Sequence, residues 1–350
     1  MISRRRLVHC LMAAVLGLTA GTALPAPPPA AAQPAGTGAL PGNGVRVIPA
    51  KTTLAEETFQ TLLVARGLQQ LGYSVGPIQE LDLPAAHLAV AEGDATFLAD
   101  HWLPSHQDYY RNAGAGAKLW RSGVFIPDNI NGYLIDKKTA DAYGITNIAQ
   151  MSDPKIARLF DTDGNGRANL TGCPPGWGCE KDIESHLDAY GLRPSIDHVQ
   201  GDYAAMMADA IARYKLGKPI FYYTWMPYWV SNVLKPGRDV VFLQVPFSGL
   251  KVDGKIVDSA QPNGKNYGWP LATQHIVANR RFIDANPAAK SFMSHIHLAV
   301  ADINSQNQAM HEGANKPADI ERHVQAWIRA HQAEWDDWIA QALAAAGKTQ

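Results

Sequence analysis

Three tryptophans stand where an aromatic ring is available to a ligand: Trp102, Trp177 and Trp225. Trp102 follows a predicted strand over 95–99, and Trp225 follows a predicted strand over 219–223. In open α/β sheets, ligands bind beyond the carboxyl ends of the strands. Indole faces attract a trimethylammonium group, which has no N–H to donate, by about 0.5–2 kcal/mol per ring. The three residues therefore predict a cage for a quaternary ammonium cation. Packing in a hydrophobic core is the alternative for each ring taken alone.

The short loop from Cys173 to Cys179 carries the most informative of these rings. Of the three cysteines, Cys10 lies in the N-terminal segment that we expect to be removed on export, which leaves this pair. An even pair of cysteines in an exported chain predicts a disulfide, and two free thiols are the alternative. The loop sequence CPPGWGC would then hold Trp177 on a rigid turn, where a large ring is difficult to bury. Rigid presentation of an aromatic ring is what a cation cage requires.

The same loop offers donors for a carboxylate. Gly178 and Cys179 precede or begin a helix predicted over 180–190, so their N–H groups have no partner within that helix. The N-terminus of a helix is a ready site for a carboxylate. His106, four residues after Trp102, is a further candidate donor, although a lone histidine is more often a surface or core residue. A cation cage beside a carboxylate site matches a betaine.

Length and composition limit the class of protein. The chain has 350 residues, of which 46% are hydrophobic. That is more than one domain of ordinary size usually contains, and it predicts two lobes. Charged residues make up 18% of the chain, and the formal net charge is −1. Because no run of Lys or Arg follows residue 6, we expect no nucleic-acid partner.

The first residues have the layout of a secretory signal peptide. Arg4–Arg6 form a positive segment, an apolar run covers 11–24, and a stretch of small residues ends at Ala32. The apolar run is too short for a membrane anchor. We therefore expect residues 1–32 to be removed on export to the periplasm. Residues 33–43 are rich in Pro, Gly and Ala and are predicted to be flexible.

Strands and helices alternate along the rest of the chain. The first helix is predicted to start in a capping box formed by Thr53 and Glu56 and to end at Gly72. This alternation predicts an α/β fold with mostly parallel sheets flanked by helices. A long final helix over 318–345 carries a tryptophan-rich stripe that we assign to packing. The other predicted strands lie at 45–48, 73–78, 95–99, 219–223 and 240–245, and the other predicted helices at 85–92, 180–190 and 203–214.

Five long stretches, spread over nearly all of the chain from about Leu40 onward, resemble one family of exported proteins. The family is that of the periplasmic glycine betaine/proline betaine-binding proteins of osmoregulatory ABC importers. The matching stretches are Thr53–Ala65 (TLAEETFQTLLVA), Gly132–Ser152 (GYLIDKKTADAYGITNIAQMS), Leu170–Glu180 (LTGCPPGWGCE), Tyr203–Ala208 (YAAMMA) and Phe221–Asn232 (FYYTWMPYWVSN).

The resemblance implies a two-lobed periplasmic binding protein fold of type II, with the ligand in the cleft between the lobes. Lobe I would hold residues 44–130 and 272–346, and lobe II would hold residues 131–271. The partners would be a betaine and, at the inner membrane, an ABC permease with its ATPase. We expect a monomer with no cofactor, no metal and no enzymatic activity.

The resemblance also assigns roles to individual residues. By motif, the family's three cage tryptophans match Trp102, Trp177 and Trp225. Its carboxylate contacts match the backbone of Gly178 and Cys179 and the side chain of His106. Its disulfide matches Cys173 with Cys179.

Alternative functions remain open at this point. The cage would also accept choline, which lacks the carboxylate and is expected to bind weakly. An osmolyte-sensing module would capture its ligand in the same way. Cys179 and His106 can also be drawn as the nucleophile and base of a thiol hydrolase, an interpretation that a disulfide removes.

Other features fit this picture less directly. Asp161–Gly166 matches the first half of a calcium loop, but the twelfth position is Gly172 rather than glutamate, so we favour an Asx-rich turn. The sequence departs from the family pattern in residues 103–106, 125–131 and 248–261.

Overall fold

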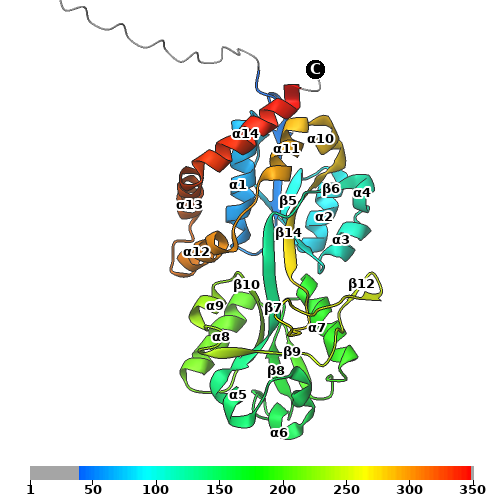
Figure 1. Ribbon diagram of the computed structural model, residues 1–350, viewed down its shortest axis with the longest axis vertical. Coiled ribbons are helices and arrows are strands. Elements are labelled where there is room, and N and C mark those ends of the chain that lie inside the picture. The colour runs from blue at the N-terminus through cyan, green and yellow to red at the C-terminus, as the bar shows by residue number, and fades with distance from the viewer. Residues whose placement is uncertain (1–38, 348–350) are drawn as a thin grey trace, which may run out of the picture. The chain divides into compact units, whose positions relative to one another are not determined.

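The computed structural model of the protein describes residues 39–347, which form an α/β structure built on a mixed sheet (Figure 1). The predicted signal peptide, residues 1–32, lies outside the described residues. The strands are β1 (Arg46–Val47), β2 (Pro49–Lys51), β3 (Ser74–Val75), β4 (Gln79–Glu80), β5 (Phe97–Leu103), β6 (Leu119–Arg121), β7 (Ile126–Asp136), β8 (Ala168–Thr171), β9 (Ile196–Val199), β10 (Phe221–Met226), β11 (Val240–Leu243), β12 (Lys251–Val252), β13 (Lys255–Ile256) and β14 (Ala272–Asn279).

Helices cover the sheet on both sides of its central strands. The helices are α1 (Glu57–Gln70), α2 (Leu83–Glu92), α3 (Gln107–Asn112), α4 (Ala115–Lys118), α5 (Lys137–Tyr143), the 3₁₀ helix η1 (Ile148–Ser152), α6 (Pro154–Ala157), α7 (Gly178–Ala189), α8 (Tyr203–Lys215), α9 (Val230–Val233), α10 (Arg280–Ala285), α11 (Pro287–His295), α12 (Val300–His311), α13 (Pro317–Ala330) and α14 (Gln332–Gly347).

Two long strands, β7 and β14, join the two halves of the main sheet, whose order is β4-β2-β5-β14-β7-β10-β8-β9. The first residues of β7 pair with β14, at Asn129 with Ala272. From Ile130 onward β7 pairs with β10 instead. Each half of the sheet therefore continues into the other through these strands, which run between the two groups of helices in Figure 1.

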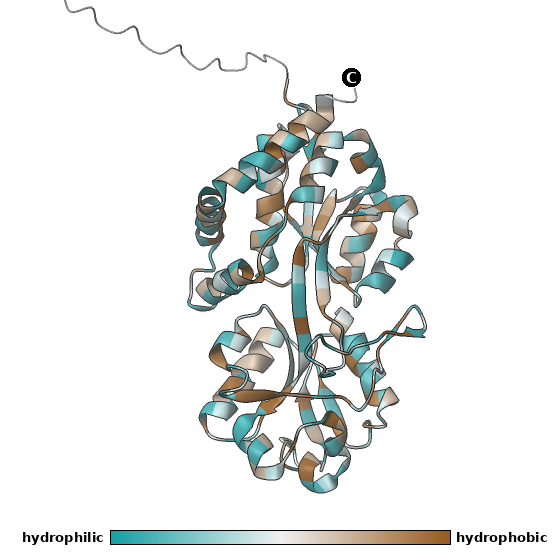
Figure 2. Ribbon diagram, in the orientation of Figure 1, coloured by the Kyte–Doolittle hydropathy of each residue, from teal (hydrophilic) through white to brown (hydrophobic). Residues whose placement is uncertain are grey.

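Each half of the sheet has its own buried core. One cluster of buried apolar residues comes entirely from the segment between Tyr133 and Trp269. The other clusters come from the segment between Val47 and Ile126 together with residues from Ile276 onward. Figure 2 shows hydrophobic residues along the central strands and on the helices beside them. The lobe boundaries stated above stay a prediction, which this separation of the cores supports.

The α/β fold class is confirmed, with a sheet that is mixed. The pairs β2–β4, β2–β5, β8–β9 and β8–β10 are parallel, as the alternation of strands and helices predicts. Strand β14 runs antiparallel to β5, β6 and β7 because the chain returns through it from the other half of the sheet.

The predicted capping box at the start of α1 is wrong. Helix α1 begins at Glu57, and Glu56 at its N-cap accepts no side-chain capping hydrogen bond. The carboxylate of Glu57 instead accepts hydrogen bonds from the Thr52 N–H at 2.8 Å and from the Thr52 Oγ1 at 2.6 Å. The start of the helix is thereby tied back to the end of β2.

The single final helix predicted over 318–345 is also wrong. The helix breaks at His331, which separates α13 from α14. The His331 ring stacks on Trp327 with centroids 4.1 Å apart, and its Nδ1 lies 2.9 Å from the Trp327 carbonyl oxygen. The break lets Trp335 and Trp338 enter the core beside Trp327, so the assignment of the tryptophan stripe to packing is confirmed.

Of the segment predicted to be flexible, residues 33–38 lie outside the described residues, and the structure shows contacts for residues 39–43. Residues 41–44 form turns, in which the Gly42 N–H donates to the Leu71 carbonyl at 2.9 Å and the Asn43 N–H donates to the Leu40 carbonyl at 2.9 Å. Gly42 also packs directly against Tyr73, where a β-carbon would lie 2.5 Å from the ring. This close approach holds the segment to the body of the protein.

We predict that Gly67→Ala destabilises the fold. Gly67 of α1 faces the fully buried ring of Phe292 on α11, and an added β-carbon would lie 1.9 Å from that ring. Overpacking of this kind costs about 1–3 kcal/mol, more than the roughly 1 kcal/mol that alanine gains in helix propensity. Thermal and denaturant unfolding would measure the loss. Gly116→Ala, in α4, whose nearest neighbour is the Tyr110 hydroxyl at 4.0 Å, is the control and should be neutral or slightly stabilising.

Candidate ligand-binding site

One cavity of about 880 Å³, part of it open to solvent, lies between the end of β5, the start of α1, the start of α7 and the end of β10. All six residues predicted to bind a ligand line this cavity: Trp102, His106, Trp177, Gly178, Cys179 and Trp225. They come from positions up to 123 residues apart in the chain. The structure therefore brings the predicted set together, and the contact of each with a ligand stays a prediction.

The two strand-end tryptophans sit slightly differently from the prediction. Strand β5 extends to Leu103 and β10 extends to Met226, so Trp102 and Trp225 lie within the last residues of their strands rather than after them. The extension follows from pairing: Trp102 is opposite Gln274 of β14, and Trp225 is opposite a residue of β7. Regular pairing fixes the direction in which each ring leaves the sheet.

Aromatic rings form a connected group on the β10 side of the cavity. The ring centroids of Trp177 and Trp225 lie 5.9 Å apart with their planes at 64°. The ring centroid of Tyr228 lies 4.3 Å from that of Trp225, and the ring centroid of Tyr203 lies 4.9 Å from that of Trp225. Tyr223 and Tyr228 line the cavity but were not among the predicted site residues. Alternation along β10 indicated only that about half of its aromatic residues face the core, which did not single them out.

Trp102 and His106 are held by a local set of hydrogen bonds. The indole Nε1 of Trp102 donates to Oδ1 of Asp100 at 2.6 Å. The Nδ1 of His106 lies 3.0 Å from the Trp102 backbone nitrogen and 3.2 Å from the Asp100 carbonyl oxygen. Burial lowers the pKa of His106 well below its usual range, and the neighbouring His87 lowers it further. His106 is therefore a neutral hydrogen-bonding group at neutral pH.

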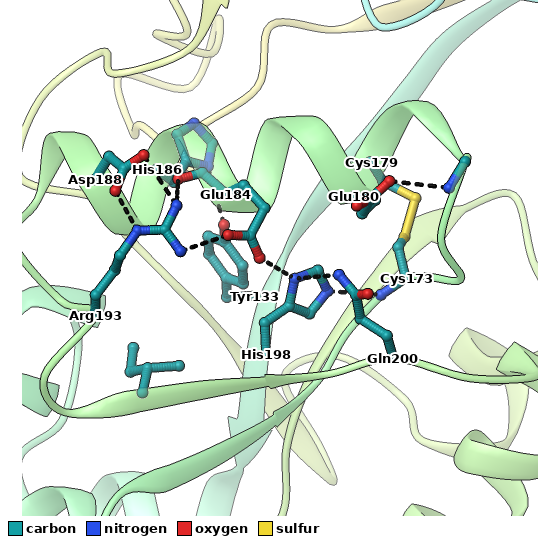
Figure 3. A network of polar contacts seen from close by, with 12 residues as sticks. Tyr133, Cys173, Cys179, Glu180, Glu184, His186, Asp188, Arg193, His198 and Gln200 are labelled. Atoms are coloured by element: carbon teal, nitrogen blue, oxygen red, sulfur yellow. Dashed lines mark hydrogen bonds and ion pairs between the residues drawn. A yellow bond between two sulfur atoms is a disulfide. The ribbon is translucent and has the colours of Figure 1, made fainter.

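The disulfide between Cys173 and Cys179 is confirmed, with the two Cα atoms 6.0 Å apart (Figure 3). Helix α7 starts directly after Trp177, at Gly178. No protein acceptor for the N–H groups of Gly178 and Cys179 is found among residues 39–347. The turn before them is fixed by Gly176, which has φ +85° and donates its N–H to Glu180 at 2.9 Å. The loop thus presents an aromatic ring and two free donors at one place.

A polar network that begins at the Cys173 N–H supports the disulfide loop (Figure 3). The buried His198 accepts a hydrogen bond from the Cys173 N–H at its Nε2, at 3.0 Å, so its Nδ1 carries the proton and donates to Glu184 at 2.7 Å. Glu184 also pairs with Arg193 at 2.5 Å. Burial by itself would raise the pKa of Glu184, but the hydrogen bonds from His198 and Arg193 lower it overall. The carboxylate therefore stays ionised and anchors the network.

The segment after Trp102 directly contacts the first turns of α7, which lie on the other side of the cavity. Ser105 donates to Asp182 at 2.5 Å, and the Trp269 indole donates to the same carboxylate oxygen at 2.9 Å. Burial raises the pKa of Asp182 to about 6. The Tyr109 hydroxyl donates to the Gly176 carbonyl at 3.2 Å. The two sides of the cavity are therefore in direct polar contact.

Three acidic side chains that were not predicted as site residues also line the cavity: Glu56, Glu57 and Asp100. Burial raises the pKa of all three. The two glutamates lie in a stretch that was assigned to a helix cap, so their role at a cavity wall was missed. Among the described residues that line the cavity, none is Lys or Arg.

The Asx-rich turn predicted for the calcium-like segment is present. The Asp161 carboxylate accepts from the N–H groups of Gly164 and Gly166, each at 2.7 Å. Within residues 39–347 no cluster of three or more metal-ligating side chains occurs. In the same part of the chain, no helix has the length and hydropathy needed to cross a membrane.

Comparison with known proteins identifies the family. Residues 45–330 match the family described as the substrate binding domain of ABC-type glycine betaine transport system. The chain belongs to this family. Over 306 residues it is 57% identical to the glycine betaine/proline betaine-binding periplasmic protein of Escherichia coli K12, covering 87% of this chain and 92% of that protein. It is 53% identical to the glycine betaine-binding periplasmic protein OusX of Dickeya dadantii, covering 88% and 92%.

Solved structures of lower identity share the fold. Lactococcal OpuAC in its closed-liganded conformation with glycine betaine superposes with a TM-score of 0.63 at 19% identity, covering 84% of this chain and 99% of that one. An ABC-transporter choline binding protein in complex with choline gives a TM-score of 0.66 at 15% identity, covering 86% and 97%. The two-lobed periplasmic binding protein fold of type II, inferred from the resemblance, is confirmed.

We predict that His198→Phe weakens the disulfide loop. The substitution leaves the Cys173 N–H without its acceptor and Glu184 without one donor, and an unpaired buried group costs about 1–3 kcal/mol. Thermal unfolding should show a loss of that size. His295→Phe, on an exposed part of α11, is the matched control and should change stability little. Equal stability of the two variants would rule out a supporting role for the network.

Proposed function

We propose that this protein is the binding component of an ABC importer and captures glycine betaine or related quaternary-ammonium zwitterions such as proline betaine. The observation that carries the proposal is one cavity lined by three tryptophans and by the first two residues of α7. The proposal also rests on the identity to periplasmic relatives named for these ligands. The protein would act in the periplasm, without catalysis, and deliver its ligand to a permease with its ATPase.

The trimethylammonium group of the ligand would occupy the cage of Trp102, Trp177 and Trp225. It has no hydrogen to donate, so the faces of aromatic rings are the groups that recognise it, at about 0.5–2 kcal/mol each. The ring planes of Trp177 and Trp225 lie at 64°, which suits a roughly spherical cation better than a flat ligand. Tyr228, packed on Trp225, would complete the wall.

The carboxylate of the ligand would accept hydrogen bonds from the N–H groups of Gly178 and Cys179. The positive end of the α7 dipole favours a negative charge at this place. His106, which is neutral because of its burial, would add a third donor without adding a charge. Cage and carboxylate site share the loop that ends at α7, so their separation is set by a short, disulfide-closed piece of chain.

Closure of the two lobes would complete the site. Trp102 and His106 belong to the proposed lobe I, whereas Trp177 and Gly178 belong to the proposed lobe II. Among residues 39–347, β7 and β14 are the paired strands that join the two cores, so these two strands are the natural hinge. A ligand that contacts both lobes stabilises the closed arrangement by its greater affinity for it.

A titration monitored by tryptophan fluorescence tests the proposal, with glycine betaine, choline and glycine as ligands. We expect saturable binding of glycine betaine and none of glycine, which has no trimethylammonium group. Choline should bind more weakly because it leaves the N–H groups of Gly178 and Cys179 without a carboxylate. Trp177→Ala should weaken betaine binding by roughly tenfold or more, since it removes a cage wall. Normal betaine binding by this variant would exclude the cage, and no response to any quaternary ammonium would exclude the proposed function.

Gly178→Ala should weaken betaine binding without unfolding the protein. An added β-carbon would lie 2.9 Å from Cδ2 of His106 and 3.0 Å from Cβ of Ser105, so the methyl group would hold the two sides of the cavity apart. We expect a loss of affinity of about tenfold, measured by calorimetry. Gly201→Ala is the control, because its methyl group would meet only the flexible Met206 side chain, at 3.4 Å. Equal affinities for the two variants would contradict the proposed closure.

A further inference from the structure

Asp100 is a buried carboxylate attached to a cage residue. Its side chain is only 4% exposed and lines the cavity. Its Oδ1 accepts hydrogen bonds from the indole Nε1 of Trp102 at 2.6 Å and from Nε2 of Gln274 at 2.8 Å. Both donors are neutral. A charge taken out of water in this way is costly unless an opposite charge compensates it.

Glu57 forms a hydrogen-bonded pair with Asp100. Two carboxyl groups can hydrogen-bond only if one of them holds a proton. Burial raises the pKa of Glu57 well above its ordinary range, and the negative charge of Asp100 raises it further. Burial also raises the pKa of Asp100, but hydrogen bonds from Glu57, Trp102 and Gln274 oppose that rise. The contact between the two carboxyl groups raises the pKa of Glu57 and lowers that of Asp100, and together with the hydrogen bonds from Trp102 and Gln274 it favours the negative charge on Asp100.

Among residues 39–347, no basic side chain forms an ion pair with Asp100. The cavity lining, as far as the structure describes it, contains no Lys or Arg. The positive charge of Lys51 lowers the pKa of Asp100. Its Nζ already donates to Glu80 at 2.7 Å and to the Thr52 carbonyl at 2.8 Å. Lys51 therefore offsets the buried negative charge only in part, because it is already paired with Glu80.

We infer that Asp100 is the counter-charge of the proposed cation site, a residue that makes the cavity select a positively charged trimethylammonium group over an uncharged group of the same shape. The inference rests on the proposed function and extends it. The faces of the tryptophan rings contact the ligand and select its shape. Asp100, hydrogen-bonded to the indole N–H at the edge of Trp102, attracts the positive charge of the ligand. A hydrogen bond from the indole N–H to an anion also makes the ring more electron-rich, which strengthens its attraction for a cation.

Glycine betaine and 3,3-dimethylbutanoate form a suitable pair of probes. The second molecule replaces the ammonium nitrogen by carbon, so it keeps the shape and the carboxylate and loses only the positive charge. Asp100→Asn keeps an oxygen acceptor for Trp102 and Gln274 while it removes the negative charge. Calorimetry would measure the affinities of both ligands for the full-length mature protein and for the variant, and competition with betaine would measure weak binding.

We expect Asp100→Asn to weaken betaine binding by about tenfold or more and to leave binding of 3,3-dimethylbutanoate unchanged or improved. The ratio of the affinity for betaine to the affinity for 3,3-dimethylbutanoate should therefore fall by at least about tenfold. Asp136→Asn is the matched control, because Asp136 is equally buried at the end of β7, where it caps α5 away from the cavity. This variant should keep the preference of the parent protein.

A preference that stays unchanged in folded Asp100→Asn overturns the inference. An equal loss of affinity for both ligands also overturns it, since that result shows a role in packing alone. If Asp100→Asn does not fold, Asp100→Leu removes the same charge with a side chain of similar size, and the same two outcomes decide. Failure of the parent protein to bind betaine is a separate result, which would reject the proposed function itself.

Discussion

The start of helix α7 is the feature on which both parts of the proposed site depend. The chain turns at Gly176 and enters the helix at Gly178, so one short segment exposes the ring of Trp177 and the unpaired N–H groups of the first helical turn. A helix that began one turn earlier would pair these donors internally. The disulfide and the network through His198 hold this start in place from two sides.

Opposite chemical requirements meet in a small space at this site. A cation cage needs apolar faces from which water is excluded, and a carboxylate site needs exposed donors. The protein separates the two requirements along one loop, with Trp177 on one side and the α7 N-terminus on the other. Burial at this site also shifts the surrounding titratable groups: it lowers the pKa of His106 and raises that of Asp182 to about 6. Burial favours the neutral form of each group, which for His106 is the form present at neutral pH.

Short-range sequence patterns were sufficient to predict most strands and helices and to name the candidate site residues. The alternation of strands and helices predicts the α/β class, and the Cys173–Cys179 loop predicts its own disulfide, because these signals are contained in short windows of sequence. Where local signals competed with long-range contacts, the predictions failed. Glu56 and Thr53 have the spacing of a capping box, yet the helix start is tied to Thr52 instead. The final helix has a continuous periodic stripe, yet it breaks at His331 because its tryptophans pack against one core from two directions.

The sequence by itself determined which rings and backbone donors are available, since Trp177, Gly178 and Cys179 are neighbours in the chain. The tertiary structure alone decided that Trp102 and Trp225 meet them, because β7 pairs with β14 at its start and with β10 from Ile130 onward and so joins the two halves of the sheet whose strand ends line one cavity. It alone also revealed the buried acids. The burial and partners of Asp100 depend on contacts with α1 and β14, which are distant in sequence and leave no local pattern.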